Sequence, residues 1–328
     1  MISHSERLHT CLEGRNIDRP PVALWRHFPV DDQSPETLVA AALRFQELYD
    51  FDLVKVTPAS SFCLMDWGVQ DSWNGNSEGT RDYTKRVISQ PADWPKLIPL
   101  DPKQGQLAEQ IECLKRLRNK LGSDTPIIQT VFNPLAQAKN LAGGALMLTH
   151  LRHNPDEVRA GLHTIAESTR RFVEACVKVG IDGIFYAIQH AQSNLLSIVE
   201  YEEFGIPYDL IALNPARDFW CNIIHLHGKE IYFSVLEEFS FNVVNWHDRE
   251  TKPSLTEARN ASDITLCGGM SIDTIVNGTP DQVVAEAREA GEQTKKHNFI
   301  LGTGCVVPIN TPHENILAAR HAYETADY

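Results

Sequence analysis

The chain lacks the features that mark membrane-spanning, secreted and nucleic-acid-binding proteins. It contains no run of roughly 18 uninterrupted apolar residues, so no segment is predicted to span a bilayer. The first residues, Met1–Arg7, lack the apolar core of a signal peptide. No dense run of Lys and Arg occurs and the formal net charge is −13, which argues against a broad nucleic-acid surface. A cytoplasmic protein that binds neither membrane nor nucleic acid is therefore expected.

Paired cysteine spacing is also absent. The seven cysteines are an odd number scattered along the chain: Cys11, Cys63, Cys113, Cys176, Cys221, Cys267 and Cys305. This spacing is typical of reduced thiols in a reducing compartment. Most of these side chains are expected to be small buried apolar groups. Cys305 differs because it ends the glycine-rich turn that begins at Gly302.

Three nucleotide-binding and repeat signatures are missing as well. No Gly-rich dinucleotide fingerprint follows the first predicted strand, no P-loop occurs, and no repeat has a period of 20 to 50 residues. With 42% hydrophobic and 22% charged residues, the chain has the composition of an ordinary globular protein. No linker divides it, so residues 1–328 are predicted to form a single domain.

Eight short apolar segments have the length and composition of β-strands, and helical segments alternate with them. They are Val22–Trp25, Asp52–Thr57, Pro126–Phe132, Gly183–Ala187, Asn222–Leu226, Asn242–Trp246, Ile264–Cys267 and Phe299–Leu301. A strand followed by a helix, repeated eight times in about 300 residues, predicts a single (β/α)8 TIM barrel. An open, doubly wound sheet is the alternative. The long segment between the second strand and Trp94 is predicted to be a functional loop.

Polar residues follow several of these strands, where the active site of such a barrel lies. His225 and His227 are two residues apart on one strand, so both imidazoles point the same way. Cys305 follows the last strand, and the three side chains together could bind zinc with a fourth position open. A hydrogen-bonded polar layer is the alternative. His247 could be a fourth ligand, a substrate contact or a simple rim residue.

Three further polar residues are candidates for contact with a substrate. Arg26 could hold a carboxylate, because a guanidinium pairs with one through two hydrogen bonds, or it could form a structural salt bridge. Gln189 and His190 follow the fourth strand. They would either face the cavity as hydrogen-bonding groups or lie in solvent.

Several short stretches, in this order, resemble the uroporphyrinogen decarboxylase superfamily. They are Arg19-Pro20-Pro21-Val22, Trp25-Arg26, Gly180-Ile181-Asp182-Gly183, His225 to Gly228, Cys267-Gly268-Gly269-Met270 and Gly302 to Pro308. The resemblance spans nearly the whole chain and implies a single (β/α)8 barrel and a homodimer. Members of the superfamily carry out two main chemistries: metal-free decarboxylation of uroporphyrinogen, and zinc-dependent methyl transfer between a corrinoid and a thiol.

The residues match the methyltransferase branch better than the decarboxylase branch. Decarboxylases carry Arg-Gln-Ala-Gly-Arg after the first strand, whereas here only Arg26 matches, and Ala59 stands where they carry an aspartate. The tyrosine that decarboxylases carry after the third strand would fall near Asn140. The methyltransferases carry His-X-Cys and a later Cys, which correspond to His225-Leu226-His227 and Cys305, with a histidine in place of the first cysteine.

The resemblance therefore implies a zinc enzyme that transfers a methyl group to a metal-activated thiol or similar acceptor. The donor would be a methylcorrinoid, carried by a partner protein, or a related molecule. His225, His227 and Cys305 would bind the metal. The residues that would orient the small-molecule substrate are Arg26, Gln189, His190 and His247. A metal-free porphyrinogen decarboxylase and a non-catalytic tetrapyrrole- or corrinoid-binding protein are the alternatives.

Overall fold

The centre of the protein is a curled parallel sheet. The computed structural model describes residues 2–324, and within them the sheet has seven strands in the order β1-β4-β5-β6-β7-β8-β9. Their bounds are β1 (Val54–Val56), β4 (Ile127–Phe132), β5 (Gly183–Ile188), β6 (Ile223–Leu226), β7 (Val243–Trp246), β8 (Thr265–Met270) and β9 (Phe299–Thr303). Every neighbouring pair is parallel, so the carboxyl ends of all seven strands lie at one edge. The predicted α/β class is confirmed.

The first predicted strand, Val22–Trp25, does not form a strand. The backbone N–H of Ala23 donates to Leu301 in β9 at 2.9 Å, and Val22 accepts from Asp52 N–H at 2.9 Å. The segment therefore lies between β9 and the residues before β1, but it forms a single bridge, between Val22 and Leu301. Ala23 N–H is used in this bridge, whereas Val22 N–H donates to the Asp52 carboxylate at 2.8 Å instead of to a neighbouring strand.

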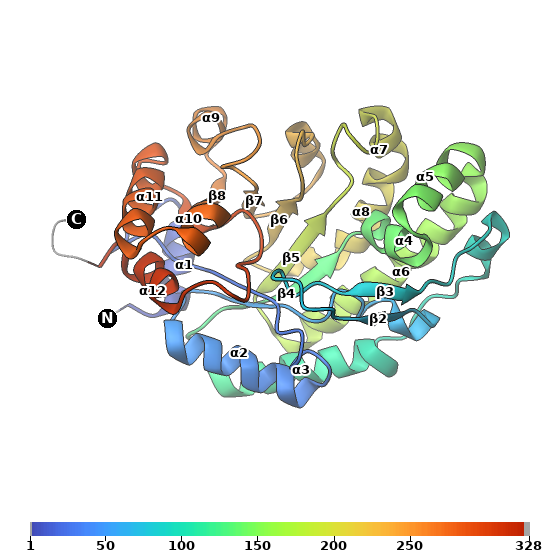
Figure 1. The fold of residues 1–328 in the computed structure, drawn as a ribbon, viewed down its shortest axis with the longest axis horizontal. Coiled ribbons are helices and arrows are strands. Elements are labelled where there is room, and N and C mark those ends of the chain that lie inside the picture. The colour runs from blue at the N-terminus through green and yellow to red at the C-terminus, as the bar shows by residue number, and fades with distance from the viewer. Residues whose placement is uncertain (1, 325–328) are drawn as a thin grey trace.

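Helices cover the outside of the sheet. They are α1 (His4–Leu12), α2 (Pro35–Tyr49), α3 (Gly105–Leu121), α4 (Pro134–Ala142), α5 (Gly144–His153), α6 (Pro155–Val179), α7 (Ile198–Phe204), α8 (Ile206–Leu213), α9 (Leu255–Ala261), α10 (Ile272–Asn277), α11 (Pro280–Gln293) and α12 (His313–His321). Short 3-10 helices are η1 (Met65–Trp67), η2 (Pro91–Lys96), η3 (Asn214–Asp218) and η4 (Phe233–Glu238). In Figure 1, α2 and α3 lie along the lower side, and α10, α11 and α12 lie on the left. No helix among residues 2–324 is long and apolar enough to cross a membrane.

Local sequence explains where the helices begin and end. Ser34 caps α2 by accepting from the Thr37 N–H, and Pro35 occupies the first turn, where its missing N–H costs nothing. Gly143 separates α4 from α5 with a φ of 94°, a backbone conformation that favours glycine. The helices place apolar side chains on the sheet, and the largest fully buried ones include Trp94, Trp246 and Tyr186.

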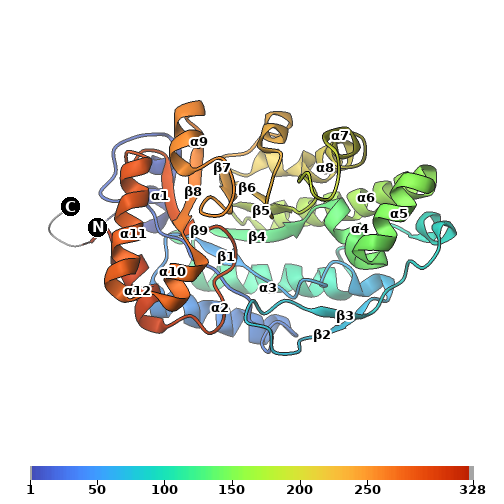
Figure 2. The same cartoon turned by 45° about the horizontal axis from the view of Figure 1, so that its top comes forward.

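The long segment after β1 contains a second, two-stranded sheet. Its strands, β2 (Gln70–Ser72) and β3 (Asp82–Lys85), are antiparallel. Figure 2 shows this hairpin beside the main sheet. These strands were not predicted from the sequence, because they are short, polar and largely exposed. The hairpin forms one wall of a cavity at the carboxyl ends of the main strands.

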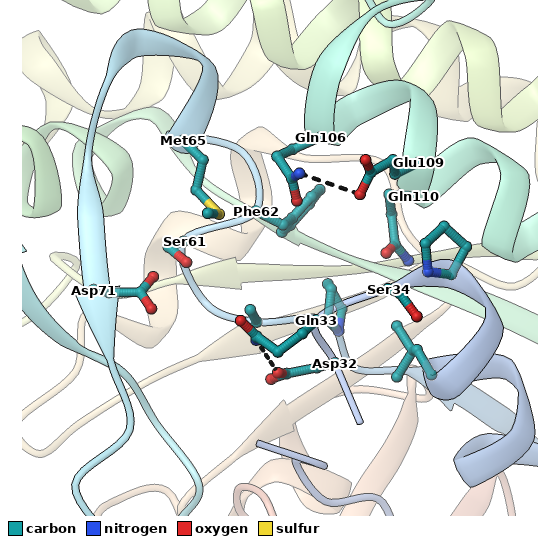
Figure 3. Close-up of a pocket in the computed structure, with 14 residues that line it drawn as sticks. Asp32, Gln33, Ser34, Ser61, Phe62, Met65, Asp71, Gln106, Glu109 and Gln110 are labelled. Atoms are coloured by element: carbon teal, nitrogen blue, oxygen red, sulfur yellow. Dashed lines mark hydrogen bonds between the residues drawn. The ribbon is translucent and has the colours of Figure 1, made fainter. Parts of the chain in front are cut away.

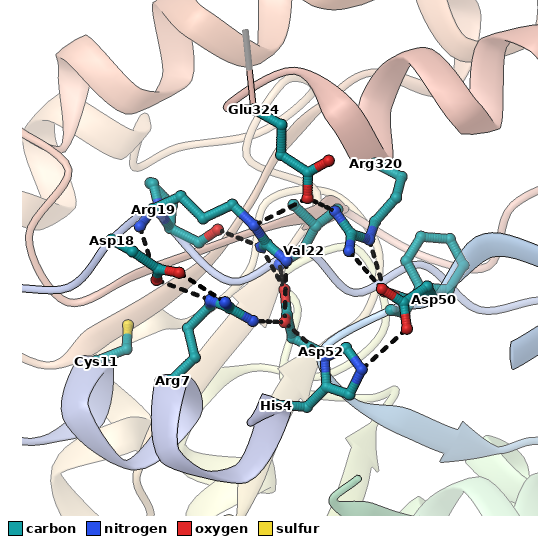
Figure 4. A network of polar contacts seen from close by, with 12 residues as sticks. His4, Arg7, Cys11, Asp18, Arg19, Val22, Asp50, Asp52, Arg320 and Glu324 are labelled. Carbon is teal, nitrogen blue, oxygen red and sulfur yellow. Dashed lines mark hydrogen bonds and ion pairs between the residues drawn. The ribbon is translucent and has the colours of Figure 1, made fainter. Parts of the chain in front are cut away.

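A network of charged side chains lies at the amino end of β1 (Figure 4). Its centre is Asp52, which is fully buried and accepts hydrogen bonds from Arg7 at 2.7 Å and from Arg19 at 2.6 Å. The ring of His4 lies 2.9 Å from the same carboxylate. The network joins α1, the segment before β1 and the chain around Val22, so it stabilises the end of the sheet opposite to the candidate site.

Candidate metal centre and its cavity

Three histidines and one cysteine meet at the carboxyl ends of the strands. His225 lies in β6, His227 directly follows that strand, His247 directly follows β7, and Cys305 comes two residues after β9. One ligand atom from each of the four lies within 4.8 Å of the other three. The parallel sheet produces this meeting, because residues 78 positions apart in sequence end up on nearby strands.

The four donor atoms surround a common space rather than forming strong hydrogen bonds with one another. The Nδ1 atom of His227 lies 3.4 Å from His225 Nε2, 3.3 Å from His247 Nε2 and 3.9 Å from Cys305 Sγ. The N–N distances are longer than typical hydrogen bonds between such groups. Three imidazole nitrogens and a sulfur that converge in this way are a donor set that zinc accepts.

Asn245, which was not predicted, determines which nitrogen of His225 faces this space. The amide Nδ2 of Asn245 donates to the carbonyls of Cys267 at 2.9 Å and Thr303 at 3.0 Å. Its Oδ1 is therefore the acceptor for His225 Nδ1–H at 2.7 Å. The lone pair of His225 is then on Nε2, toward the other donors, which is the tautomer that a metal ligand needs.

Burial keeps the three imidazoles neutral. It lowers the pKa of His225 well below its ordinary value and that of His227 to about 4. It also lowers the pKa of His247, although Glu250 opposes the shift. Neutral imidazole is the form that binds metal. Burial raises the pKa of the Cys305 thiol to about 11, so a nearby cation is needed before this sulfur is a thiolate at neutral pH.

A cavity of about 400 Å³ adjoins this group. His225, His227 and Cys305 line one part of it, and residues of the β2–β3 hairpin line another. Four cationic side chains line the cavity against one carboxylate: Lys55, Arg81, Arg86 and Lys139, against Glu78. The cavity is thus basic in a protein whose formal net charge is −13.

Lys55 is a site residue that sequence reasoning missed. It is 8% exposed, and its Nζ lies 3.3 Å from Thr57 Oγ1 and 4.5 Å from the ring centre of Phe185. The Phe185 ring stacks on His225 at 5.1 Å, so Lys55 is separated from the donor group by one ring. Burial lowers its pKa to about 7, against the effect of Cys305. A lysine in the middle of the buried segment Val54-Lys55-Val56 was the available signal.

Gln189 lines the cavity, which is one of the two positions predicted for it, the other being in solvent. Its Oε1 accepts from Lys139 Nζ at 2.9 Å. Arg86 lies on the other side of Lys139 and donates to the Asn140 carbonyl at 2.5 Å. Burial lowers the pKa of Lys139, and the charge of Arg86 lowers it further. Neither cation has a carboxylate partner among the described residues, so this part of the cavity is suited to an anion.

Arg26 and His190 are not among the side chains that line the cavity. The guanidinium of Arg26 lies over the rings of Phe28 and Phe45, at 5.2 Å and 5.3 Å. His190 is 2% exposed, and burial lowers its pKa to about 3. The structure therefore brings His225, His227, Cys305 and Gln189 together at one cavity. His247 joins the donor group but does not line that cavity. The substrate roles of Arg26 and His190 stay predictions.

Known proteins identify the family. The profile described as uroporphyrinogen decarboxylase (URO-D) matches residues 3–325. The chain belongs to the URO-D family. Its relatives include two methylcobamide:CoM methyltransferases. MtaA of Methanosarcina barkeri is 24% identical over 347 residues, which cover 97% of each chain, and MtbA of Methanosarcina acetivorans is 22% identical over 95% of this chain and 94% of its own.

The fold of this URO-D protein is also found in a solved structure. A methyltransferase from Methanosarcina mazei aligns with a TM-score of 0.84 and 21% sequence identity, covering 99% of both chains. At this level of identity the likeness establishes the fold. The predicted membership of the URO-D superfamily and the resemblance to its methyltransferase branch are confirmed.

Proposed function

We propose that this URO-D protein is a zinc-dependent methyltransferase, which moves a methyl group from a methylcorrinoid or related donor to a metal-activated thiol or similar acceptor. The observation that carries the proposal is the convergence of His225, His227, His247 and Cys305 within 4.8 Å beside a large cavity. The full-length similarity to two methylcobamide:CoM methyltransferases supports the same reaction class.

The side chains fit a zinc ion. His225, His227 and Cys305 would hold it, and His247 would either complete the coordination or leave a position to the acceptor. Bound zinc lowers the pKa of a thiol, so that the nucleophilic thiolate is present at neutral pH. Asn245 holds His225 in the required tautomer. With one cysteine ligand, the dication would keep a net positive charge that an acceptor thiolate can neutralise.

The basic cavity supports an acceptor with an anionic group. Lys139 and Arg86 would bind that group, and Gln189 would position Lys139 through their 2.9 Å hydrogen bond. His247 would contact the substrate from the other side. Arg26 and His190 lie behind the cavity lining, so any effect on substrate orientation would act through the loops that they support.

The family resemblance also implies a partner protein, a homodimer and a closed barrel. A partner protein would present the methylcorrinoid at the cavity mouth, and the chain would form a homodimer, as the family resemblance implies. The curled sheet would close as a single (β/α)8 domain of residues 1–328, with Val22–Trp25 in the place of the eighth strand. The hydrogen bonds of Val22 and Ala23 to both neighbouring segments support this closure.

The direct experiment is metal analysis of protein purified without chelators. We expect about one zinc per chain, lost in His225→Ala and Cys305→Ala, because each removes a ligand from a site of four donors. His163→Ala, at an exposed position of α6, is the control and retains zinc. Absence of zinc from the native protein, with no effect of the two ligand variants on folding or activity, would refute the proposal.

Decarboxylation of a porphyrinogen is the second candidate, because the family match and the basic cavity both suit a polycarboxylate. Turnover of uroporphyrinogen by metal-free protein would establish it. Ala59, which replaces the decarboxylase aspartate, argues against it, since a methyl group cannot accept the pyrrole N–H bonds. Binding of a corrinoid or porphyrinogen with an optical shift but no turnover would instead support a non-catalytic binding protein.

A further inference from the structure

A second, smaller cavity lies away from the candidate metal centre. It has a volume of about 70 Å³ and is bounded by β2, the loop after β1, the start of α2 and one side of α3. None of its lining residues lines the large cavity. Figure 3 shows that Asp71, Ser61 and Asp32 approach the space from three different segments.

Three oxygen atoms of these residues are buried without a hydrogen-bond partner. They are Oδ2 of Asp32, Oδ2 of Asp71 and Oγ of Ser61, considered over residues 2–324. The exposed fraction of the side chain is 0% for Asp32 and 6% for Asp71, and Ser61 is 0% exposed. Buried polar atoms without partners are rare and indicate that a water or an ion completes the site.

The charges of the site do not balance. Asp32 forms an ion pair with Nη2 of Arg81, and Asp71 Oδ1 lies 3.8 Å from Nε of the same guanidinium. Two buried carboxylates thus share one cation, which leaves one negative charge in a buried region. Glu109 also lines the cavity, but it is exposed to solvent. Burial raises the pKa of Asp32, and the neighbouring Asp71 carboxylate adds to the shift. An uncompensated buried charge is costly, and a further cation would relieve it while keeping both carboxylates ionised.

We propose that this cavity binds one monovalent cation, K⁺ or Na⁺, through oxygen atoms of Asp32, Asp71 and Ser61. Hard cations prefer oxygen ligands, and one positive charge balances the buried group of Asp32, Asp71 and Arg81. The cavity has room for the ion and several waters, since about 10–15 Å³ of such volume holds one water. A divalent site would need more acidic ligands, and among the described residues only the His225 group brings three or more His, Cys, Asp or Glu donors together.

The bound ion would act on the wall of the large cavity. Asp71 belongs to β2, and Arg81, which lines the large cavity, directly precedes β3. Asp32 belongs to the turn before α2. A cation between the two carboxylates would therefore hold the hairpin against the start of α2 and keep Arg81 in place. This ion site is independent of whether the His225 group binds zinc.

Thermal unfolding of the full-length protein in different salts tests the proposal. At about 100 mM salt, where general screening is equal, we expect a Tm about 2 °C higher in KCl or NaCl than in tetramethylammonium chloride, whose methyl groups keep oxygen ligands away from the charge. Asp71→Asn should remove this difference. Glu47→Gln, which removes an exposed carboxylate on α2, should retain it.

Equal Tm values in all three salts, or an unchanged difference in Asp71→Asn, would overturn the proposal. Because that variant could fail to fold, a second measurement uses the unchanged protein. Crystals grown in RbCl should show an anomalous-scattering peak between Asp32 and Asp71. A site that contains only water gives no such peak and refutes the assignment, whereas neither result bears on zinc binding or methyl transfer.

Discussion

The two ends of the sheet bury charged and titratable groups in opposite ways. At the amino end, Asp52 is surrounded by His4, Arg7 and Arg19, so every charge has a partner (Figure 4). At the carboxyl end, His225 and His227 lie beside another histidine and a thiol, without a carboxylate in the group. At the amino end the chain itself supplies the countercharges, whereas the carboxyl end presents donor atoms to which a metal or ligand could bind.

The same residue type therefore titrates differently at the two ends. The hydrogen bond with Asp52 raises the pKa of His4, while burial lowers the pKa of His225 well below its ordinary value. Burial alone would raise the pKa of Asp52, but hydrogen bonds from His4 and Arg19 outweigh it and hold the pKa well below normal. A buried group is stabilised in its charged form only where the chain itself supplies the countercharge.

The largest expected effect comes from breaking the paired end. Asp52→Asn leaves the guanidiniums of Arg7 and Arg19 without their buried countercharge, so we expect the free energy of unfolding to fall by about 3–5 kcal/mol. Urea denaturation measures this change. Asp50→Asn is the matched control: its carboxylate pairs with Arg320 but is 64% exposed, and it should cost about 1 kcal/mol or less. Similar losses for both variants would contradict the difference.

At the carboxyl end, the orientation of His225 depends on Asn245. Asn245→Leu removes the acceptor for His225 Nδ1–H, so we expect zinc affinity to fall by about 10- to 100-fold. Competition with a chromophoric chelator measures it. Asn245→Asp keeps an acceptor at this position and should lose less affinity. Equal affinities in all three proteins would show that Asn245 does not determine the tautomer.

Lys55 offers a test in which stability and function move in opposite directions. Lys55→Met removes a buried amine that has no carboxylate partner within residues 2–324, so we expect the protein to become about 1–2 kcal/mol more stable. Methyl transfer or acceptor binding should weaken, because the residue lies beside the donor group. Denaturation and activity measurements on the same sample decide. A loss of stability would show that Lys55 is part of a paired structural network like that of Asp52.

The smallest expected effect is in the pH dependence of stability. Burial lowers the pKa of His27, which lines the large cavity, to about 3. The contribution of neutral His27 to the free energy of unfolding is therefore fully present above the ordinary histidine pKa of about 6.5. It is lost as the pH falls, by about 1 kcal/mol between pH 7 and 5.5. In His27→Gln, the free energy of unfolding should therefore fall by about 1 kcal/mol less between pH 7 and pH 5.5 than in the unchanged protein. Urea titration at the two pH values measures this.

His4→Gln is the control of opposite sign. Because the pKa of His4 is raised in the folded state, its contribution is present at pH below its ordinary value and is lost as the pH rises through the raised pKa. The variant should therefore lose stability at pH 5.5 more than at pH 8. If both histidine variants changed the pH dependence of stability in the same direction, the two ends of the sheet would not shift histidine pKa values in opposite directions.

The sequence predicted that His225, His227 and Cys305 lie close together, because this depends on simple periodicities. His225 and His227 are two residues apart on an extended segment, and Cys305 follows a strand of the same parallel sheet, so their meeting could be predicted. The same periodicity explains the different position of Arg26. Its neighbours Trp25 and His27 line the cavity, and side chains alternate along extended backbone, so Arg26 points to the other side.

The residues that complete the site could not be found in this way. Asn245 is 20 positions from His225, and nothing in its local sequence indicates a hydrogen bond to an imidazole. Lys55 is unusual in sequence only as a lysine between two valines, and its place beside Phe185 and Trp25 depends on the fold. The oxygens of Asp32, Ser61 and Asp71 come from a turn, a loop and a hairpin strand, so only their arrangement in space leaves them without partners.

The sequence by itself determined the alternation of strands and helices, the family, and the placement of His225, His227 and Cys305 at strand ends, because these depend on local periodicity and short motifs. Only the tertiary structure decided which titratable groups are paired and which are left for a ligand. Burial and countercharge depend on neighbours from distant parts of the chain. That dependence is why His4 and His225, identical as residues, have shifts of opposite sign.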